Sequence, residues 1–143
     1  MQAFVFGGEK HERLEIAVHG YERGATGDYH DDNWLSVEVS IRSGAFQGRF
    51  QAAFLTGELE AFHDQLVLLH QTLRGKAEFR TLEEQLTLSL TSDGRGHMQL
   101  SGEALDQAGI GNRLIFGILL DQTQLQSSVQ SLAAVLAAYP VRT

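Results

Sequence analysis

The residues from Gly27 to Ile41 read Gly-Asp-Tyr-His-Asp-Asp-Asn-Trp-Leu-Ser-Val-Glu-Val-Ser-Ile, and their second half has the clearest strand pattern in the chain. From Leu35 onward, apolar residues alternate with serine and glutamate, which is the pattern of a strand covered on one face. Residues 28–34, at the entry to that strand, hold three aspartates, two aromatic residues and a histidine. The stretch therefore predicts a sheet and, just before it, the best candidate for a functional surface.

Alternating segments lie on both sides of this strand. A turn at Ser43-Gly44 leads into the alternation of residues 46–54, which predicts an antiparallel hairpin. Similar patterns predict strands near residues 4–6, 14–18, 77–79, 86–90 and 98–104. Residues 113–120 are apolar at both parities, so we expect there a central strand covered on both faces. The long connection from His19 to Asn33 shows no apolar periodicity, and loops of that length are either functional or loose.

Two segments have the spacing of amphipathic helices. Leucine and phenylalanine recur at positions 59, 62, 66, 69 and 73, with Thr56 as the expected N-cap and Gly75 as the expected end. Apolar residues recur again at positions 125, 129, 132, 136 and 139, after a cap at Asp121 or Thr123 and before Pro140. Each helix has one apolar stripe, so each needs a sheet face to cover.

The predicted fold is therefore α+β. We expect an antiparallel sheet, curved or split in two, of about seven to eight strands, with both helices packed on it, in a single domain spanning residues 1–143. Each half of the chain repeats the order of strands followed by one helix, so a degenerate duplication also fits the pattern.

Composition narrows the classes of function. The formal net charge of −7 argues against a nucleic-acid partner and is compatible with a basic protein partner. The absence of cysteine excludes disulfides, thiol catalysis and thiolate zinc sites. The sequence holds no apolar run close to the ~20 residues that a membrane span needs, and its first residues lack the pattern of a signal peptide. We therefore expect a cytoplasmic protein without a membrane partner.

The acidic entry to the strand can be interpreted in two ways. Asp28, Asp31 and Asp32, with His30 between them, are oxygen-rich enough for a hard cation, but they lack the spacing of a calcium loop and are typical of solvated turns. A small-ligand or divalent-metal domain built on this loop and on residues 106–111 is thus the alternative function. The sequence contains none of the familiar catalytic motifs, so we expect no enzyme, metal or cofactor.

Aromatic residues favour a contact surface at the same place. Trp34 has the parity of Ser36 and Glu38, which are on the polar side of the strand. A tryptophan there either covers a second, smaller core or lies at an interface, where aromatic residues dominate the binding energy. Tyr29 is next to the aspartates and extends the same surface. Unpaired edge strands leave homo-oligomerisation as a further possibility.

The motif Asp31-Asp32-Asn33-Trp34-Leu35-Ser36-Val37-Glu38-Val39 resembles the WapI-like family of bacterial proteins. The likeness extends to Gly44-Ala45-Phe46-Gln47-Gly48-Arg49-Phe50, to residues 54–73 and to Gly94-Arg95-Gly96-His97. The family is named for an immunity protein that protects its producer from a secreted toxin acting on tRNA. Asp31, Asn33 and Trp34 match the recurring Asp-x-Asn-Trp core of the family, whereas Asp32 stands at a position where variation is expected.

The resemblance and the negative charge lead to one hypothesis. It is a cytoplasmic protein-binding module that neutralises a basic nuclease toxin by occlusion. The expected contact residues are Asp28, Tyr29, Asp31, Asp32, Asn33 and Trp34.

Overall fold

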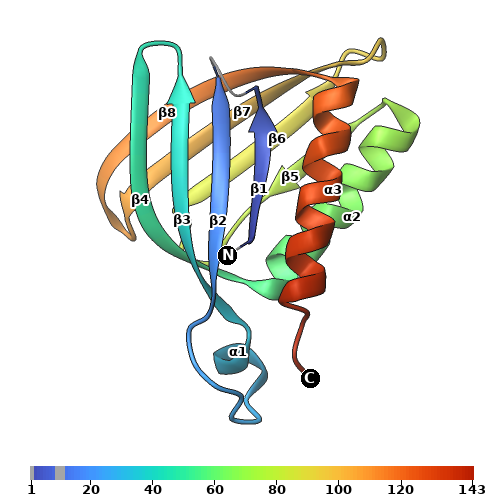
Figure 1. Ribbon diagram of the computed structural model, residues 1–143. Coiled ribbons are helices and arrows are strands. Elements are labelled where there is room, and N and C mark those ends of the chain that lie inside the picture. The colour runs from blue at the N-terminus through green and yellow to red at the C-terminus, as the bar shows by residue number, and fades with distance from the viewer. Residues whose placement is uncertain (1, 9–11) are drawn as a thin grey trace.

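The computed structural model describes residues 2–8 and 12–143, which form two four-stranded sheets and three helices (Figure 1). Every strand in each sheet pairs antiparallel with its neighbour in sequence, in the orders β1-β2-β3-β4 and β5-β6-β7-β8. The first sheet comprises β1 (Gln2–Gly7), β2 (Arg13–Tyr21), β3 (Trp34–Ser43) and β4 (Phe46–Leu55). The second comprises β5 (Lys76–Phe79), β6 (Leu86–Ser92), β7 (His97–Gln107) and β8 (Ile110–Asp121). The predicted α+β class, with a sheet split in two, is confirmed.

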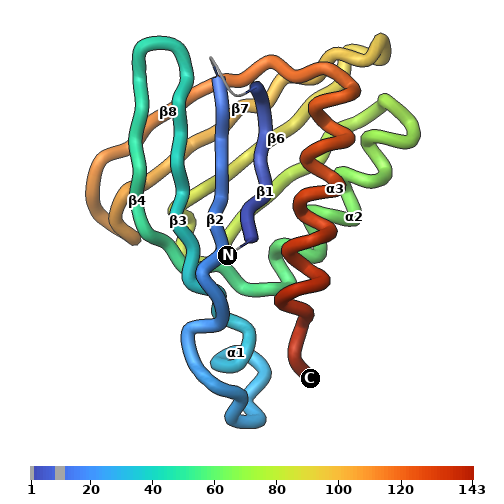
Figure 2. Tube along the Cα trace, viewed as in Figure 1, coloured from blue at the N-terminus to red at the C-terminus, as the bar shows by residue number. Residues whose placement is uncertain are grey.

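The two sheets lie one behind the other with their strands crossing, and the two long helices run along one side of both (Figure 2). One cluster of buried side chains, from both sheets and both helices, fills the space between them. Phenylalanines at positions 4, 6, 54, 62 and 79 are among its largest members. The alternation that predicted the strands is thus the alternation between this core and solvent.

The two halves of the chain have the same order of elements. Each half is a meander of four strands followed by a 17-residue helix, α2 (Thr56–Thr72) in the first and α3 (Gln122–Ala138) in the second. However, each helix packs beside the first strand of the other half, α2 against β5 and α3 against β1 (Figure 1). The arrangement is reciprocal, and it fits the duplication that the sequence pattern indicated.

The helices also bond to the sheet edges that they cover. The side chain of Gln65 in α2 accepts a hydrogen bond from the main-chain N–H of Glu78 at 2.8 Å and donates one to its carbonyl at 3.2 Å. In α3, Ser128 donates to the carbonyl of Val5 at 2.5 Å, and Ser131 accepts from the Val5 N–H at 3.3 Å. The outer edges of β5 and β1 are therefore satisfied by side chains, which removes two exposed strand edges.

Three local predictions need correction. Residues 113–120 lie in β8, which is an edge strand and not a central one. Ile115 and Leu119 are exposed on the outer face of β8, so this strand is not covered on both faces. Helix α2 begins at Thr56, so Leu55 rather than Thr56 is its N-cap, and the Glu58 side chain accepts the Leu55 N–H at 2.8 Å. The same helix ends at Thr72, before Gly75. Helix α3 is capped by Asp121, which is one of the two capping residues that the sequence predicted.

Candidate functional site

The predicted functional stretch is a protruding loop that contains a short helix. Residues 22–33 connect β2 to β3 and extend beyond the end of the first sheet, and within them α1 (Tyr29–Asp32) forms a single turn (Figure 1). Asp28 is the N-cap of this turn, and its carboxylate accepts the N–H of Asp31 at 3.0 Å. The sequence pattern did not predict α1, because one turn is too short to show an apolar stripe.

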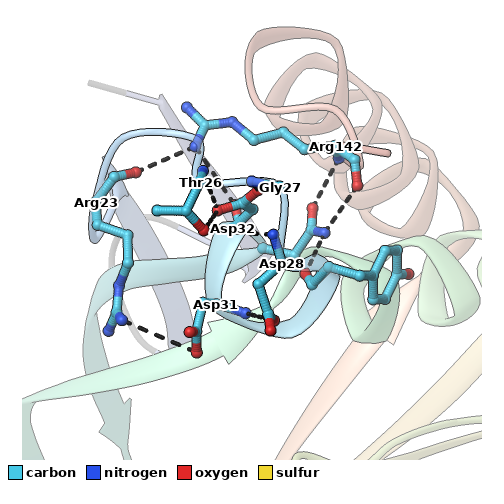
Figure 3. Close-up of polar contacts among 9 residues, drawn as sticks. Arg23, Thr26, Gly27, Asp28, Asp31, Asp32 and Arg142 are labelled. Atoms are coloured by element: carbon cyan, nitrogen blue, oxygen red, sulfur yellow. Dashed lines mark hydrogen bonds and ion pairs between the residues drawn. The ribbon is translucent and has the colours of Figure 1, made fainter.

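Asp32 holds the loop together from within. Its carboxylate is buried and accepts hydrogen bonds from the Thr26 N–H at 2.7 Å, the Thr26 hydroxyl at 2.8 Å and the Gly27 N–H at 2.8 Å (Figure 3). These bonds, led by the one from the Thr26 hydroxyl, hold the pKa of Asp32 below its usual value of 3.8. Asp32 is therefore bonded to its own loop.

Asn33 joins the loop to the C-terminal segment. Its buried side chain donates to the carbonyls of Tyr29 at 2.7 Å and Arg142 at 2.9 Å. Its amide oxygen accepts the Arg142 N–H at 2.7 Å and the Thr56 hydroxyl at 2.8 Å. One side chain thus fixes three parts of the chain that are far apart in sequence, namely α1, the start of α2 and the C-terminal segment.

Arg142 strengthens the same junction. Its guanidinium carbon lies 3.5 Å from the centroid of the Tyr21 ring, which is a cation–π contact. It also donates to the carbonyl of Arg23 at 3.1 Å (Figure 3). The Tyr21 hydroxyl donates to the Pro140 carbonyl. Sequence reasoning missed Arg142, because nothing in its local pattern shows that the chain end returns to residues 21–33.

The other predicted residues remain accessible. Asp28 and Asp31 are exposed, and Asp31 forms an exposed ion pair with Arg23 at 3.9 Å. The Tyr29 side chain is 51% exposed, and Trp34 is partly buried at the start of β3. Residues 28–31 therefore present two carboxylates and a tyrosine to solvent, while Asp32 and Asn33 keep the loop in shape.

A groove runs beside Tyr29. It encloses about 470 Å³ and lies between α1, the first turns of α2 and β5. Its lining includes the acidic side chains Glu58 and Glu78 and the apolar side chain of Ala61. Burial raises the pKa of Glu58, although that carboxylate also accepts the N–H groups of Leu55 at 2.8 Å and Leu82 at 2.6 Å. Arg80 and His30 also line the groove, and Arg80 pairs with Glu78 at 3.1 Å, so the groove joins the loop to a surface of mixed charge on the body of the protein.

The features that suggested a ligand or metal site do not come together. Among residues 2–8 and 12–143, no group of three or more histidine, aspartate or glutamate side chains is placed to hold a metal ion. The Asp106 carboxylate is bonded to the Asn112 N–H at 2.8 Å and to its side-chain amide at 3.1 Å, which lowers the pKa of Asp106. Asp106 therefore shapes its own hairpin turn.

No helix of the described residues is both long and apolar enough to cross a membrane. A search among curated proteins found no match. A family model, that of the Immunity protein WapI-like family, matches residues 5–140. Since the match covers almost the whole chain, including the protruding loop and both long helices, the chain belongs to the WapI-like immunity protein family.

Proposed function

We propose that this chain is a cytoplasmic immunity protein that neutralises a nuclease toxin by binding over its RNA-binding cleft. Membership in the family supports the immunity role and, with it, a toxin as the protein partner. The proposed mode of binding depends on the difference in burial between neighbouring side chains of residues 22–33. Asp32 and Asn33 are buried and fix the loop, whereas Asp28, Tyr29 and Asp31 are exposed on its surface.

A fixed loop favours tight binding. The bonds made by Asp32 and Asn33 hold the loop in one shape before any partner arrives, so little conformational entropy is lost on association. An RNA-cleaving enzyme needs a basic cleft for its substrate, and Asp28 and Asp31 offer that cleft a complementary charge. Tyr29, which lines the adjacent groove, supplies the large aromatic contact typical of interface hot spots.

Co-expression with the toxin domain encoded beside this gene tests the immunity role. The wild-type chain should restore growth of cells that produce the toxin. A variant combining Asp28→Asn, Tyr29→Ala and Asp31→Asn should fold but protect poorly. Glu103→Gln, which removes a charge from the outer face of β7, should protect like wild type. Equal toxicity with and without the wild-type chain would contradict the proposal.

Occlusion needs a separate measurement. If the loop lies over the cleft, the purified complex should no longer bind tRNA, and excess tRNA should slow the association of the two proteins. A complex that is inactive yet still binds tRNA with unchanged affinity would show that the toxin is inhibited in another way.

A further inference from the structure

The four outer sheet edges differ in how they are covered. The edges of β1 and β5 are bonded to side chains of α3 and α2, as described above. The edge of β8 is covered near its middle, where the Ser43 hydroxyl donates to the Gly117 carbonyl at 2.7 Å. The edge of β4 is covered at its second half, where the Gln85 side chain donates to the Gln51 carbonyl at 3.3 Å. The first half of β4, like the parts of β8 on either side of Gly117, has no such bond among the described residues.

The bond to Gln51 fixes which main-chain groups of β4 face outward. In an antiparallel strand, residues two apart direct their N–H and carbonyl groups to the same side. Gln47 and Arg49 therefore direct theirs, like Gln51, away from β3. Among the described residues, none bonds to the main chain of Gln47 or Arg49 on that side. Residues 46–49 are all exposed, and the Phe46 side chain is 67% exposed.

We propose that a second copy of this chain pairs with the first half of β4. The two β4 strands would lie antiparallel about a two-fold axis at Gly48. This register places Gln47 opposite Arg49 of the second copy, and Arg49 opposite its Gln47. Both residues direct their main chains outward, so four main-chain hydrogen bonds close across the axis.

The side chains match in the same register. On the face shared with Ile41, Phe46 stands opposite Phe50 of the second copy on each side of the axis, which forms two aromatic cross-strand pairs. Gly48, at the axis, has no side chain to keep the strands apart. Moving the axis by one residue to Arg49 would put two arginines directly opposite each other, which is destabilising. The register centred on Gly48 is therefore self-complementary and is favoured over the one centred on Arg49.

The aromatic pairs would lie beside a groove of the same copy. A groove of about 320 Å³ lies between the start of β4 and the β7–β8 hairpin, and Phe46, Phe50 and Leu114 form part of its lining. The β3–β4 turn is at the opposite end of the molecule from α1 (Figure 1). A dimer through β4 would therefore leave the Asp28–Asp31 surface accessible in both copies. With so few paired residues, we expect a weak dimer that forms only at high protein concentration.

Cysteine cross-linking tests the register directly. The chain contains no cysteine, and a Cβ built on Gly48 meets no atom within 4 Å. Gly48→Cys should therefore fold, and at the axis it should join two copies by a disulfide under mild oxidation. Ser101→Cys, on an exposed position of a central strand, is the matched control. We expect Gly48→Cys to cross-link at least on the order of tenfold faster, because pairing raises the local thiol concentration.

Light scattering over a concentration series completes the test. The wild-type mass should rise with concentration. Gln47→Pro should remain monomeric with an unchanged melting temperature, because it removes an N–H that faces outward. Phe46→Ser should weaken the dimer as a second variant, should the proline disturb the hairpin. Equal cross-linking rates for both cysteine variants, or a wild-type chain that is monomeric at every concentration, would overturn the proposal.

Discussion

The side chain of Asn33 pairs with the main chain of Arg142 as a neighbouring strand would, accepting its N–H at 2.7 Å and donating to its carbonyl at 2.9 Å. The two residues are 109 positions apart, so this pair closes a loop that holds about three quarters of the 143 residues. It also explains why a buried asparagine precedes β3. The C-terminal segment needs a partner that presents a donor and an acceptor together, and a side-chain amide supplies both.

Asn33→Ala is expected to lower the free energy of unfolding by about 2–3 kcal/mol, since it removes four hydrogen bonds and leaves the buried Thr56 hydroxyl without its acceptor. Urea denaturation followed by circular dichroism measures the change. Asn112→Ala removes an exposed asparagine that bonds to Asp106 and should cost less than about 1 kcal/mol. Equal losses in the free energy of unfolding would show that the bonds of Asn33 stabilise the fold no more than those of the exposed Asn112.

Acid should weaken the loop through Asp32. The pKa of this carboxylate is lower in the folded state than its usual value of 3.8, so the folded state binds this proton less readily than the unfolded chain does. The stabilisation is present above the unfolded pKa and is lost as the pH falls through the folded pKa. Melting temperatures measured from pH 6 down to pH 2 should therefore fall less steeply for Asp32→Asn than for wild type.

Thr26→Val is the companion variant for this pH experiment. It removes the hydroxyl that contributes most to the lowered pKa of Asp32 but leaves the carboxylate in place. The folded-state pKa of Asp32 should rise toward that of an ordinary aspartate, so the fall in melting temperature between pH 6 and pH 2 should become smaller than in wild type. An unchanged pH profile in both variants would mean that Asp32 does not contribute to acid sensitivity.

Gly102→Ala should destabilise the second sheet. Gly102 is buried in β7 opposite Phe116, and a Cβ at this position would lie 2.2 Å from the tip of the Phe116 ring. The ring would have to move within the core, at a cost of about 1–3 kcal/mol. Gly48→Ala is the control, because a Cβ there meets nothing within 4 Å. Thermal or urea unfolding of the two variants should show a large difference between two glycines that both lie in strands.

The charged loop should control the rate of association with the toxin. The double variant Asp28→Asn, Asp31→Asn should bind more slowly than wild type, and its association rate should depend less on salt, because exposed charges steer the encounter. Stopped-flow or biosensor measurements at several ionic strengths give both quantities. An association rate that is the same in both proteins at low salt would remove these two carboxylates from the encounter surface.

The sequence predicted most of the fold because burial alternates cleanly along the strands. The Leu35–Ile41 alternation and the helical stripes gave the hairpin, the α+β class and both long helices. The edge position of β8 could not be predicted, because Ile115 and Leu119 are large and apolar yet exposed. Apolar character at both parities is ambiguous between a covered strand and an edge strand that presents an apolar face.

The sequence located the candidate site, but it did not show which of its residues are exposed and which hold the loop together. The composition of residues 28–34 marked the loop, yet Asp31 and Asp32 are adjacent residues of the same type with opposite environments, one exposed and one buried. The difference arises from the direction of each side chain on one turn of helix. Neither Thr26, which binds Asp32, nor Arg142, which binds Asn33, carries any local signal of that contact.

The reciprocal placement of the two helices has a consequence for biosynthesis. Strand β1 leaves the ribosome before the other strands, but α3, the helix that covers its edge, follows all of them. During translation the edge of β1 therefore exposes unpaired N–H and carbonyl groups until α3 has emerged. A nascent chain stalled before residue 122 should depend strongly on chaperones, whereas one that includes α3 should not.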